Sequence, residues 1–181
     1  MSTKYSTQNI PAIHDRKIFF DANVLIYLFW PSGSHHWETI YSSAFSNLLQ
    51  QQNEMVVDFL VISEIINRAH RLEYDKYLAV NSITKNNFSY KQYRDSVDGQ
   101  TSLTDIYLIV ETNILQRFTI VGKSFTKDEI RAFLALEPMD FTDKGILLTC
   151  KENNCILLTN DKDYKAADVD ILTSNPAILV N

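Results

Sequence analysis

The chain has 181 residues, of which 45% are hydrophobic and 22% are charged, and its formal net charge is −5. This length and composition suit one domain with a substantial core, alone or with short extensions. The longest apolar run, 24–30, is too short to cross a membrane, and the polar segment 1–16 lacks the apolar stretch of a secretory signal. An acidic net charge is not typical of a nucleic-acid-binding protein, but it does not exclude one. A site built from several carboxylates makes the whole chain more acidic, and a bound divalent metal reverses the sign of the local charge.

The cysteines and histidines give no sign of a zinc site. The sequence has only Cys150 and Cys155, four histidines and no Cys-x-x-Cys pattern. We therefore predict reduced thiols and a cytoplasmic protein.

The chain contains few turn signals, with four Gly and four Pro in total, and so we expect mostly regular structure. In chain order, strands are expected at 17–20, 55–57, 119–121, 155–158 and 169–172. Helices are expected at 24–30, 36–50, 60–72 and 142–152, with another after the capping residue Thr126 and a helical middle at 74–118. Alternating strands and helices predict an α/β fold with a parallel sheet and helices on both faces. In such sheets the functional site lies at the carboxyl ends of the strands.

Four acidic residues stand in unusual positions, although each one also has an ordinary structural explanation. Asp21 ends an apolar strand, where it could simply cap the following helix. Glu64 shares a helix face with apolar neighbours, or pairs with Arg68 one turn later. Asp143 lies in the first turn of a helix, where the dipole favours a negative charge. Asp161 follows an apolar strand, where aspartate is a common turn residue.

The joint placement of these acids is more informative than any one of them. A parallel sheet brings Asp21 and Asp161 to the same edge, and Glu64 faces inward. Four carboxylates in one place repel and raise one another's pKa unless a cation neutralises them. A set of oxygen ligands without His or Cys favours Mg²⁺ or Mn²⁺. Such a metal can activate water for the hydrolysis of a phosphodiester bond.

The segments that contain these acids resemble the PIN-domain ribonucleases, and the VapC-type toxins in particular. The matching segments are FFDANVLIYL (19–28), ISEIINR (62–68), TDKGILLTC (142–150) and ILLTNDKDY (156–164). The segment ILTSNPAIL further resembles the short last strand and proline of that family. The resemblance covers roughly 17–70 and 141–178.

The resemblance implies a PIN-like α/β/α sandwich with a short, mostly parallel central sheet, and metal-dependent endoribonuclease activity. The residues that match catalytic metal ligands are Asp21, Glu64, Asp143 and Asp161. Those that match supporting residues are Asn23, Thr159 and Asn160, and Asp163 matches a less regular extra acid. The implied partners are an RNA substrate, Mg²⁺ or Mn²⁺, a cognate antitoxin if the chain is the toxin of a toxin–antitoxin pair, and a second copy in a homodimer. No membrane partner is expected.

Two parts of the chain depart from small members of that family: the extension 1–16 and the long helical middle 74–118 within a single domain 17–181. Candidate phosphate contacts are Arg68, Arg71, Lys123 and Lys144, although a plain surface charge is the simpler explanation of each one. Two other functions remain open. The first is a PIN-like module that binds RNA or protein without cutting it. The second is a phosphatase of the haloacid-dehalogenase type, which Asn23 disfavours because that site needs Asp-x-Asp.

Overall fold

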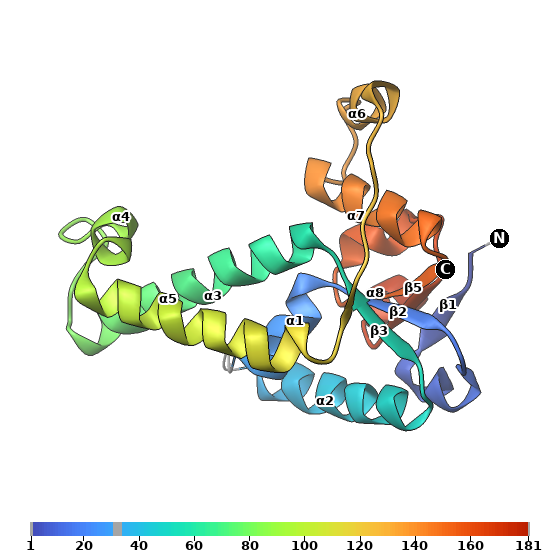
Figure 1. Cartoon of the computed structure of the whole chain (residues 1–181), viewed down its shortest axis with the longest axis horizontal. Helices are drawn as coiled ribbons and strands as arrows, with labels where there is room; N and C mark the ends of the chain where they lie inside the picture. Colours follow the sequence, from blue (N-terminus) through green and yellow to red (C-terminus); the bar gives the residue numbers. More distant parts are fainter. Residues whose placement is uncertain (1, 31–33, 181) are drawn as a thin grey trace.

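Six strands form one sheet in the computed structural model, which describes residues 2–30 and 34–180 (Figure 1). The strands are β1 (Lys4–Ser6), β2 (Lys17–Phe20), β3 (Glu54–Val57), β4 (Thr119–Ile120), β5 (Cys155–Leu158) and β6 (Ile171–Thr173). Their spatial order is β1-β6-β5-β2-β3-β4, and each neighbouring pair of these described strands is parallel. The predicted α/β fold with a parallel sheet is confirmed.

Helices lie on both sides of this sheet, with α7 above the strands and α2 below them in Figure 1. The α-helices are α1 (Ala22–Phe29), α2 (His35–Gln50), α3 (Phe59–Val80), α4 (Tyr90–Arg94), α5 (Val97–Ile109), α6 (Lys127–Phe133), α7 (Phe141–Glu152) and α8 (Pro176–Leu179). Two short 3₁₀ segments, η1 (Thr7–Ala12) and η3 (Lys162–Ala166), and a π-helical turn, η2 (Val110–Leu115), complete the described elements.

The centre of the sheet is formed by β2 and β5, whose side chains are almost entirely buried. Parallel strands that are covered on both faces are apolar at consecutive positions, which explains the sequences IFF and CILL. The last residues of the two strands, Phe20 and Leu158, are register partners. The polar residues Asp21 and Thr159 follow them directly and therefore emerge side by side.

The first residues of the chain belong to the sheet. Strand β1 pairs with β6 through Lys4–Ile171, Tyr5–Leu172 and Ser6–Thr173. This edge strand was not predicted, because three half-buried residues in a polar segment carry no clear strand pattern. The division into an extension and a single domain remains a prediction.

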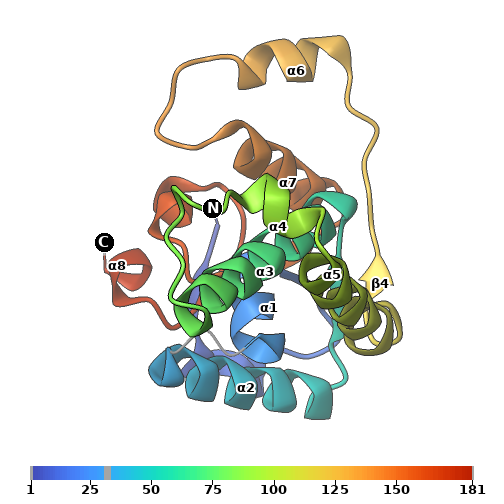
Figure 2. The same cartoon turned by 90° about the vertical axis from the view of Figure 1, so that its left-hand side faces the viewer.

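Helix α3 runs eight residues beyond its predicted end at 72 and forms an arm with α5. The two helices lie side by side and point away from the sheet, with α4 at the far end (Figures 1 and 2). The buried residues Tyr74, Leu78 and Tyr93 give this arm a small core of its own. At Gly99 a Cβ atom would lie 1.9 Å from the carbonyl oxygen of Tyr93, so the close contact between α4 and α5 requires glycine.

A second projection is formed by α6 and its flanking loops, which stand apart from the sheet in Figure 1. Thr126 caps α6 as predicted, and its hydroxyl accepts a hydrogen bond from the backbone N–H of Glu129. The loop after α6 is anchored by Lys144 of α7. The Nζ atom of this lysine donates hydrogen bonds to the carbonyl oxygens of Phe133 (3.0 Å) and Ala135 (2.7 Å).

Both cysteines are buried and free. Among the described helices, none is both long enough and apolar enough to span a bilayer.

Candidate active site

The candidate site lies where β2 and β5 end and where α1, α3 and α7 begin. Helix α1 starts immediately after β2, and η3 follows β5 after Thr159 and Asn160. This is the carboxyl edge of the parallel sheet, where ligands bind in open α/β folds.

Asp21 forms the centre of the site and is almost fully buried. It caps α1, and its Oδ1 atom accepts a 2.7 Å hydrogen bond from the backbone N–H of Ala22. Its Oδ2 atom accepts hydrogen bonds of 2.6 Å from Asn23 Nδ2 and from Thr159 Oγ1. The helix-cap explanation of Asp21 is therefore confirmed. The cap uses only one of its two oxygens, and the other is fixed by polar side chains.

Burial raises the pKa of Asp21 from its ordinary value of 3.8 to about 7. The hydrogen bond from Thr159 acts in the opposite direction, and the negative charges of Glu64 and Asp143 raise this pKa further. Keeping this carboxylate ionised costs free energy, because the group is desolvated and lies among like charges.

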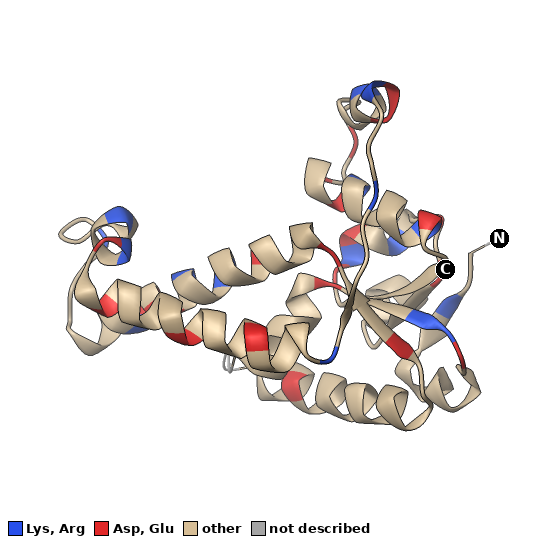
Figure 3. Ribbon diagram, in the orientation of Figure 1, with Lys and Arg blue, Asp and Glu red and all other residues tan. Residues whose placement is uncertain are grey.

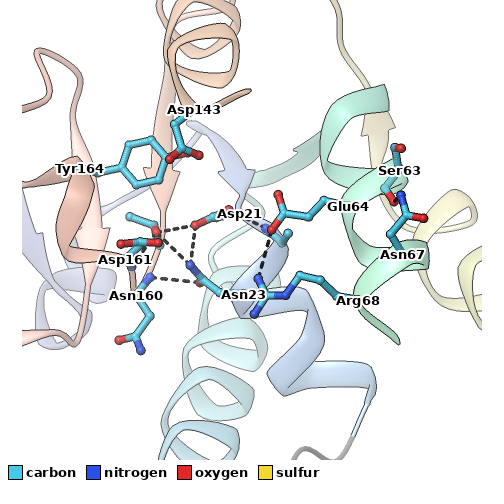
Figure 4. Close-up of polar contacts among 12 residues, drawn as sticks. Asp21, Asn23, Ser63, Glu64, Asn67, Arg68, Asp143, Asn160, Asp161 and Tyr164 are labelled. Carbon is cyan, nitrogen blue, oxygen red and sulfur yellow. Dashed lines mark hydrogen bonds and ion pairs between the residues drawn. The ribbon is translucent and has the colours of Figure 1, made fainter. Parts of the chain in front are cut away.

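Thr159 and Asn160 connect the end of β5 to the first aspartate. Thr159 Oγ1 accepts a hydrogen bond from the backbone N–H of Asp161 (3.0 Å) while it donates to Asp21. The backbone N–H of Asn160 donates to Asn23 Oδ1 (3.2 Å), and Tyr41 donates from its hydroxyl to Asn160 Oδ1 (3.0 Å). The residues predicted to support the acids thus form one network around Asp21 (Figure 4).

Asp143 reaches the site from the first turn of α7. Asp140 is the actual cap of that helix, since its Oδ1 atom accepts a hydrogen bond from the backbone N–H of Asp143 (2.9 Å). Burial raises the pKa of Asp143 to about 6; the hydrogen bond from Tyr164 lowers it, and the charges of Asp140, Asp161 and Glu64 raise it. The charges of two other predicted acids, Glu64 and Asp161, thus act on Asp143, and the charge of Asp143 in turn acts on Asp21.

Tyr164 is a buried member of the site that the sequence analysis missed. Its hydroxyl donates a 2.7 Å hydrogen bond to Asp143 Oδ1. The only signal was an aromatic residue three positions after Asp161, and nothing local connects it with α7. The contact fixes the orientation of the Asp143 carboxylate.

Glu64 lies on α3, and its Oε1 atom forms a 3.1 Å ion pair with Arg68 Nη1. Both side chains point from α3 toward Asp21 in Figure 4. The simple explanation of Glu64 as an i,i+4 partner of Arg68 is therefore confirmed. The same carboxylate also borders the acidic cavity.

Asp161 caps η3, and its Oδ1 atom accepts a hydrogen bond from the backbone N–H of Asp163 (3.0 Å). The side chain of Asp163 is exposed and borders a different cavity, beside Lys144 and Lys151. The side chain of Asp163 thus does not line the cavity that the four acids share.

The four predicted acids line one cavity of about 360 Å³. Its lining residues are Asp21, Asn23, Leu60, Ser63, Glu64, Asn67, Arg68, Asp140, Thr142, Asp143 and Asp161. All four predicted acids are included. Of the other lining residues, Ser63 and Asn67 could have been found from the sequence, because they lie one position before and three after Glu64 on the same helix.

The chemistry of this cavity suits a hard divalent cation, because its donors are carboxylate oxygens and two of the acids have raised pKa values. The spacing of these donors is less complete than a metal site requires. Within residues 2–30 and 34–180, no three His, Cys, Asp or Glu side chains are close enough, as they stand, to hold one metal ion. One of the four acids, Glu64, is engaged by Arg68 in an ion pair.

Two of the four predicted phosphate contacts are engaged elsewhere. Lys144 is buried and bound to backbone carbonyls, so its assignment was wrong. Lys123 Nζ lies 2.9 Å from Glu129 Oε1 and 2.7 Å from Glu152 Oε2, away from the acidic cavity. Arg68 borders that cavity, and Arg71 is exposed on the same helix.

The fold and the site define an α/β protein with a carboxylate-lined cavity at the carboxyl edge of a parallel sheet. The model of the PIN domain family matches residues 18–170, and the chain belongs to that family.

The chain also shares its fold with solved structures. FitAcB from Neisseria gonorrhoeae contains a chain that is 16% identical, with a TM-score of 0.52; the match covers 86% of this chain and 96% of that one. VapBC2 from Rickettsia felis, solved bound to a DNA fragment from its promoter, gives 16% identity and a TM-score of 0.52 over 87% of this chain and 98% of that one. No curated protein matches the sequence significantly.

Proposed function

We propose that this protein is a metal-dependent endoribonuclease that hydrolyses phosphodiester bonds in RNA, with Mg²⁺ or Mn²⁺ as its cofactor. The observation that carries the proposal is the single cavity lined by Asp21, Glu64, Asp143 and Asp161. Membership of the PIN domain family supports it.

The four acids would hold the divalent ion, which supplies water activation and neutralises charge on the phosphoryl oxygens. The chain's own residues orient these acids. Thr159 and Asn23 fix one oxygen of Asp21, and Tyr164 fixes one oxygen of Asp143. Such supporting contacts tune the affinity of a metal site.

Arg68 has a second role in this proposal. Its guanidinium group lies on the wall of the cavity and is paired with Glu64. A guanidinium fork binds phosphate oxygens with the same two-pronged geometry as it binds a carboxylate, so a substrate phosphate can compete with Glu64 for Arg68. Binding of RNA would thus draw Arg68 to the phosphate and release Glu64 to the metal.

We further propose that the chain is the toxin of a toxin–antitoxin pair, with an antitoxin protein as its partner. The support is its structural likeness to FitAcB and to VapBC2, the latter bound to DNA from its promoter. A homodimer and a cytoplasmic location remain predictions.

A module that binds RNA without cutting it is the alternative function. The ion pair between Glu64 and Arg68 favours it, because that contact engages one of the four acids and, among the described residues, no three acidic side chains are close enough to hold a metal ion. Cleavage and metal binding must therefore be measured separately.

The deciding experiment incubates the protein with total cellular RNA in Mn²⁺, in Mg²⁺ and in EDTA. We expect fragments with either metal, none in EDTA, and a loss on the order of a hundredfold in Asp143→Asn. Asp163→Asn is the matched control and should cut normally, because Asp163 borders another cavity.

Thermal melting in the presence of the same metals detects metal binding and does not depend on the choice of RNA. A metal at about a hundred times its dissociation constant adds roughly 2.7 kcal/mol to the free energy of unfolding. We expect this shift in the wild type and in Asp163→Asn but not in Asp143→Asn. If neither a shift nor RNA fragments are seen while RNA still binds, the protein is the non-cutting module.

A further inference from the structure

The face of α3 that borders the acidic cavity continues beyond it. Glu64 and Arg68 point into the cavity, and Arg71 is the next basic residue, seven positions after Glu64 and nearly two full turns along the helix. At 1.5 Å per residue, Arg71 lies about 10 Å further along the helix axis than Glu64. Figure 3 shows basic residues along α3 and on α4 at the far end of the arm. An RNA strand that leaves the cavity along this helix therefore passes Arg71.

Among the described basic residues of the arm, Arg71 and Lys91 form no ion pair, and of these two only Arg71 lies on α3, the helix that borders the cavity. Ion pairs tie up Arg68 with Glu64, Lys76 with Glu73, Lys85 with Asp75, and Arg94 with Asp95. Among the described residues, no ion pair is formed by Arg71, although its side chain is exposed. Its positive charge is thus available to an anionic ligand.

The guanidinium group of Arg71 is nevertheless held in place. Its Cζ atom lies 4.5 Å from the centroid of the Tyr90 ring, within the range of a cation–π contact. Tyr90 is the first residue of α4, so this contact joins α3 to the tip of the arm. A guanidinium group that is already oriented by an aromatic ring loses less freedom when it binds a phosphate.

The Tyr90 ring is itself fixed by a buried histidine. Its hydroxyl forms a 2.8 Å hydrogen bond with His70 Nδ1, and His70 Nε2 forms a 3.0 Å hydrogen bond with the carbonyl oxygen of Gly99 on α5. His70 is buried, so this chain of contacts anchors the Arg71–Tyr90 pair to the core of the arm.

We propose that Arg71, stacked on Tyr90, is a phosphate-binding subsite for single-stranded RNA that extends from the acidic cavity along α3. This inference rests on the proposed function, because it takes the cavity as the place of the scissile phosphate. An RNA strand fits better than a protein partner because Arg71, which forms no ion pair, lies in line with the cavity along a polar helix face that includes Asn67. Single-stranded RNA binds to sites that combine cations with aromatic side chains.

The test is RNA binding in Mg²⁺, measured by fluorescence anisotropy at several salt concentrations, on the slowly cutting Asp143→Asn background. The probes are a fluorescein-labelled single-stranded RNA of about a dozen nucleotides and a labelled dinucleotide. We expect Arg71→Ala to weaken binding of the long RNA several-fold and to reduce the slope of log K against log [salt] by about 0.7, the value for one phosphate contact. Binding of the dinucleotide, which occupies only the cavity, should not change.

Three further variants separate the subsite from a general effect of charge or folding. Arg71→Lys should keep the salt slope but bind more weakly, because a lysine cannot stack as a planar group. Tyr90→Leu should weaken binding of the long RNA without changing the slope of log K against log [salt]. Arg94→Ala is the matched control, since Arg94 is an exposed cation on α4 that is paired with Asp95. It should bind like the parent.

The possible outcomes distinguish a failure of the Arg71 subsite from a failure of the proposed nuclease function. If Arg71→Ala binds the long RNA with the affinity and slope of the parent, the subsite is wrong and the proposed nuclease function is unaffected. If the parent binds neither RNA and the wild type cuts none, the proposed function fails together with the subsite. If Arg71→Ala melts at a lower temperature than the parent, Arg71→Lys supplies the test, and a parental affinity in that variant contradicts the proposal.

Discussion

Thr159 donates a 2.6 Å hydrogen bond from its hydroxyl to Asp21 Oδ2, although the two residues are 138 positions apart in the sequence. Neighbouring parallel strands bring them together, since β2 and β5 end in register at Phe20 and Leu158. Thr159 is fully buried, so this contact both stabilises the fold and orients the first acid of the candidate site.

We expect Thr159→Val to lower the free energy of unfolding by about 1–3 kcal/mol, because a buried carboxylate loses a donor that no water replaces. The pKa of Asp21 should also rise, since the hydrogen bond from Thr159 lowers it. Urea denaturation measures the first effect. Thr159→Ser keeps the hydroxyl and is the control; a valine variant as stable as the wild type would contradict this account.

The metal-free protein should be more stable at mildly acidic pH than at neutral pH. Burial raises the pKa of Asp21 from 3.8 to about 7 and that of Asp143 to about 6, so in this interval the folded state binds more protons than the unfolded state. Stability therefore falls as the pH rises from about 4 to about 7.

Denaturation in EDTA across this pH range tests the prediction. In Asp21→Asn the dependence should become shallower, because the group with the larger shift is gone. Asp163→Asn should follow the wild type. A stability that rises steadily with pH from 4 to 7 would show that these two acids are not desolvated as the structure indicates.

The fold could be predicted from the sequence because its signals are local. The run KIFFD shows a buried strand that ends in an acid, and LLTND repeats that pattern near the other end of the chain. Once the sheet is parallel, both acids must reach the same edge. The positions of Asp21 and Asp161 thus followed from the order of the elements.

The contacts that complete the site could not be predicted in the same way. Tyr164 meets Asp143 through the packing of η3 against α7, and no spacing in the sequence reports that packing. Lys144 was taken for a surface cation, because a lysine one position after an acid gives no sign of burial. Its carbonyl partners are Phe133, the last residue of α6, and Ala135 in the loop that follows, and their positions are set only by the tertiary structure.

Lys144 should control the order of the α6 projection. The substitution Lys144→Met keeps the length of the buried side chain but removes its hydrogen bonds to the end of α6 and to the loop that follows. We expect faster amide hydrogen exchange at Lys127–Phe133 and little change in β2 or β5, because local opening depends on local contacts. Lys151→Met is the control, since Lys151 is exposed and pairs with Asp168. Equal exchange in both variants would mean that other contacts hold the projection.

The ion pair between Arg68 and Glu64 predicts that a substitution of Arg68 changes the affinity for metal and the affinity for RNA in opposite directions. Arg68 engages Glu64 at 3.1 Å and adds a positive charge to the wall of the cavity. In Arg68→Gln the carboxylate is free and the charge is gone, so Mn²⁺ should bind more tightly than in the wild type. RNA should bind more weakly, because a phosphate contact is lost.

Calorimetric titration with Mn²⁺ and anisotropy with labelled single-stranded RNA measure the two effects of Arg68→Gln. Lys76→Gln is the matched control, because Lys76 forms a similar pair with Glu73 further along α3, outside the cavity. Glu64→Gln should weaken Mn²⁺ binding in either background, since it removes the carboxylate itself. If Arg68→Gln weakens Mn²⁺ binding as well, Arg68 holds Glu64 in position for the metal and does not compete with it.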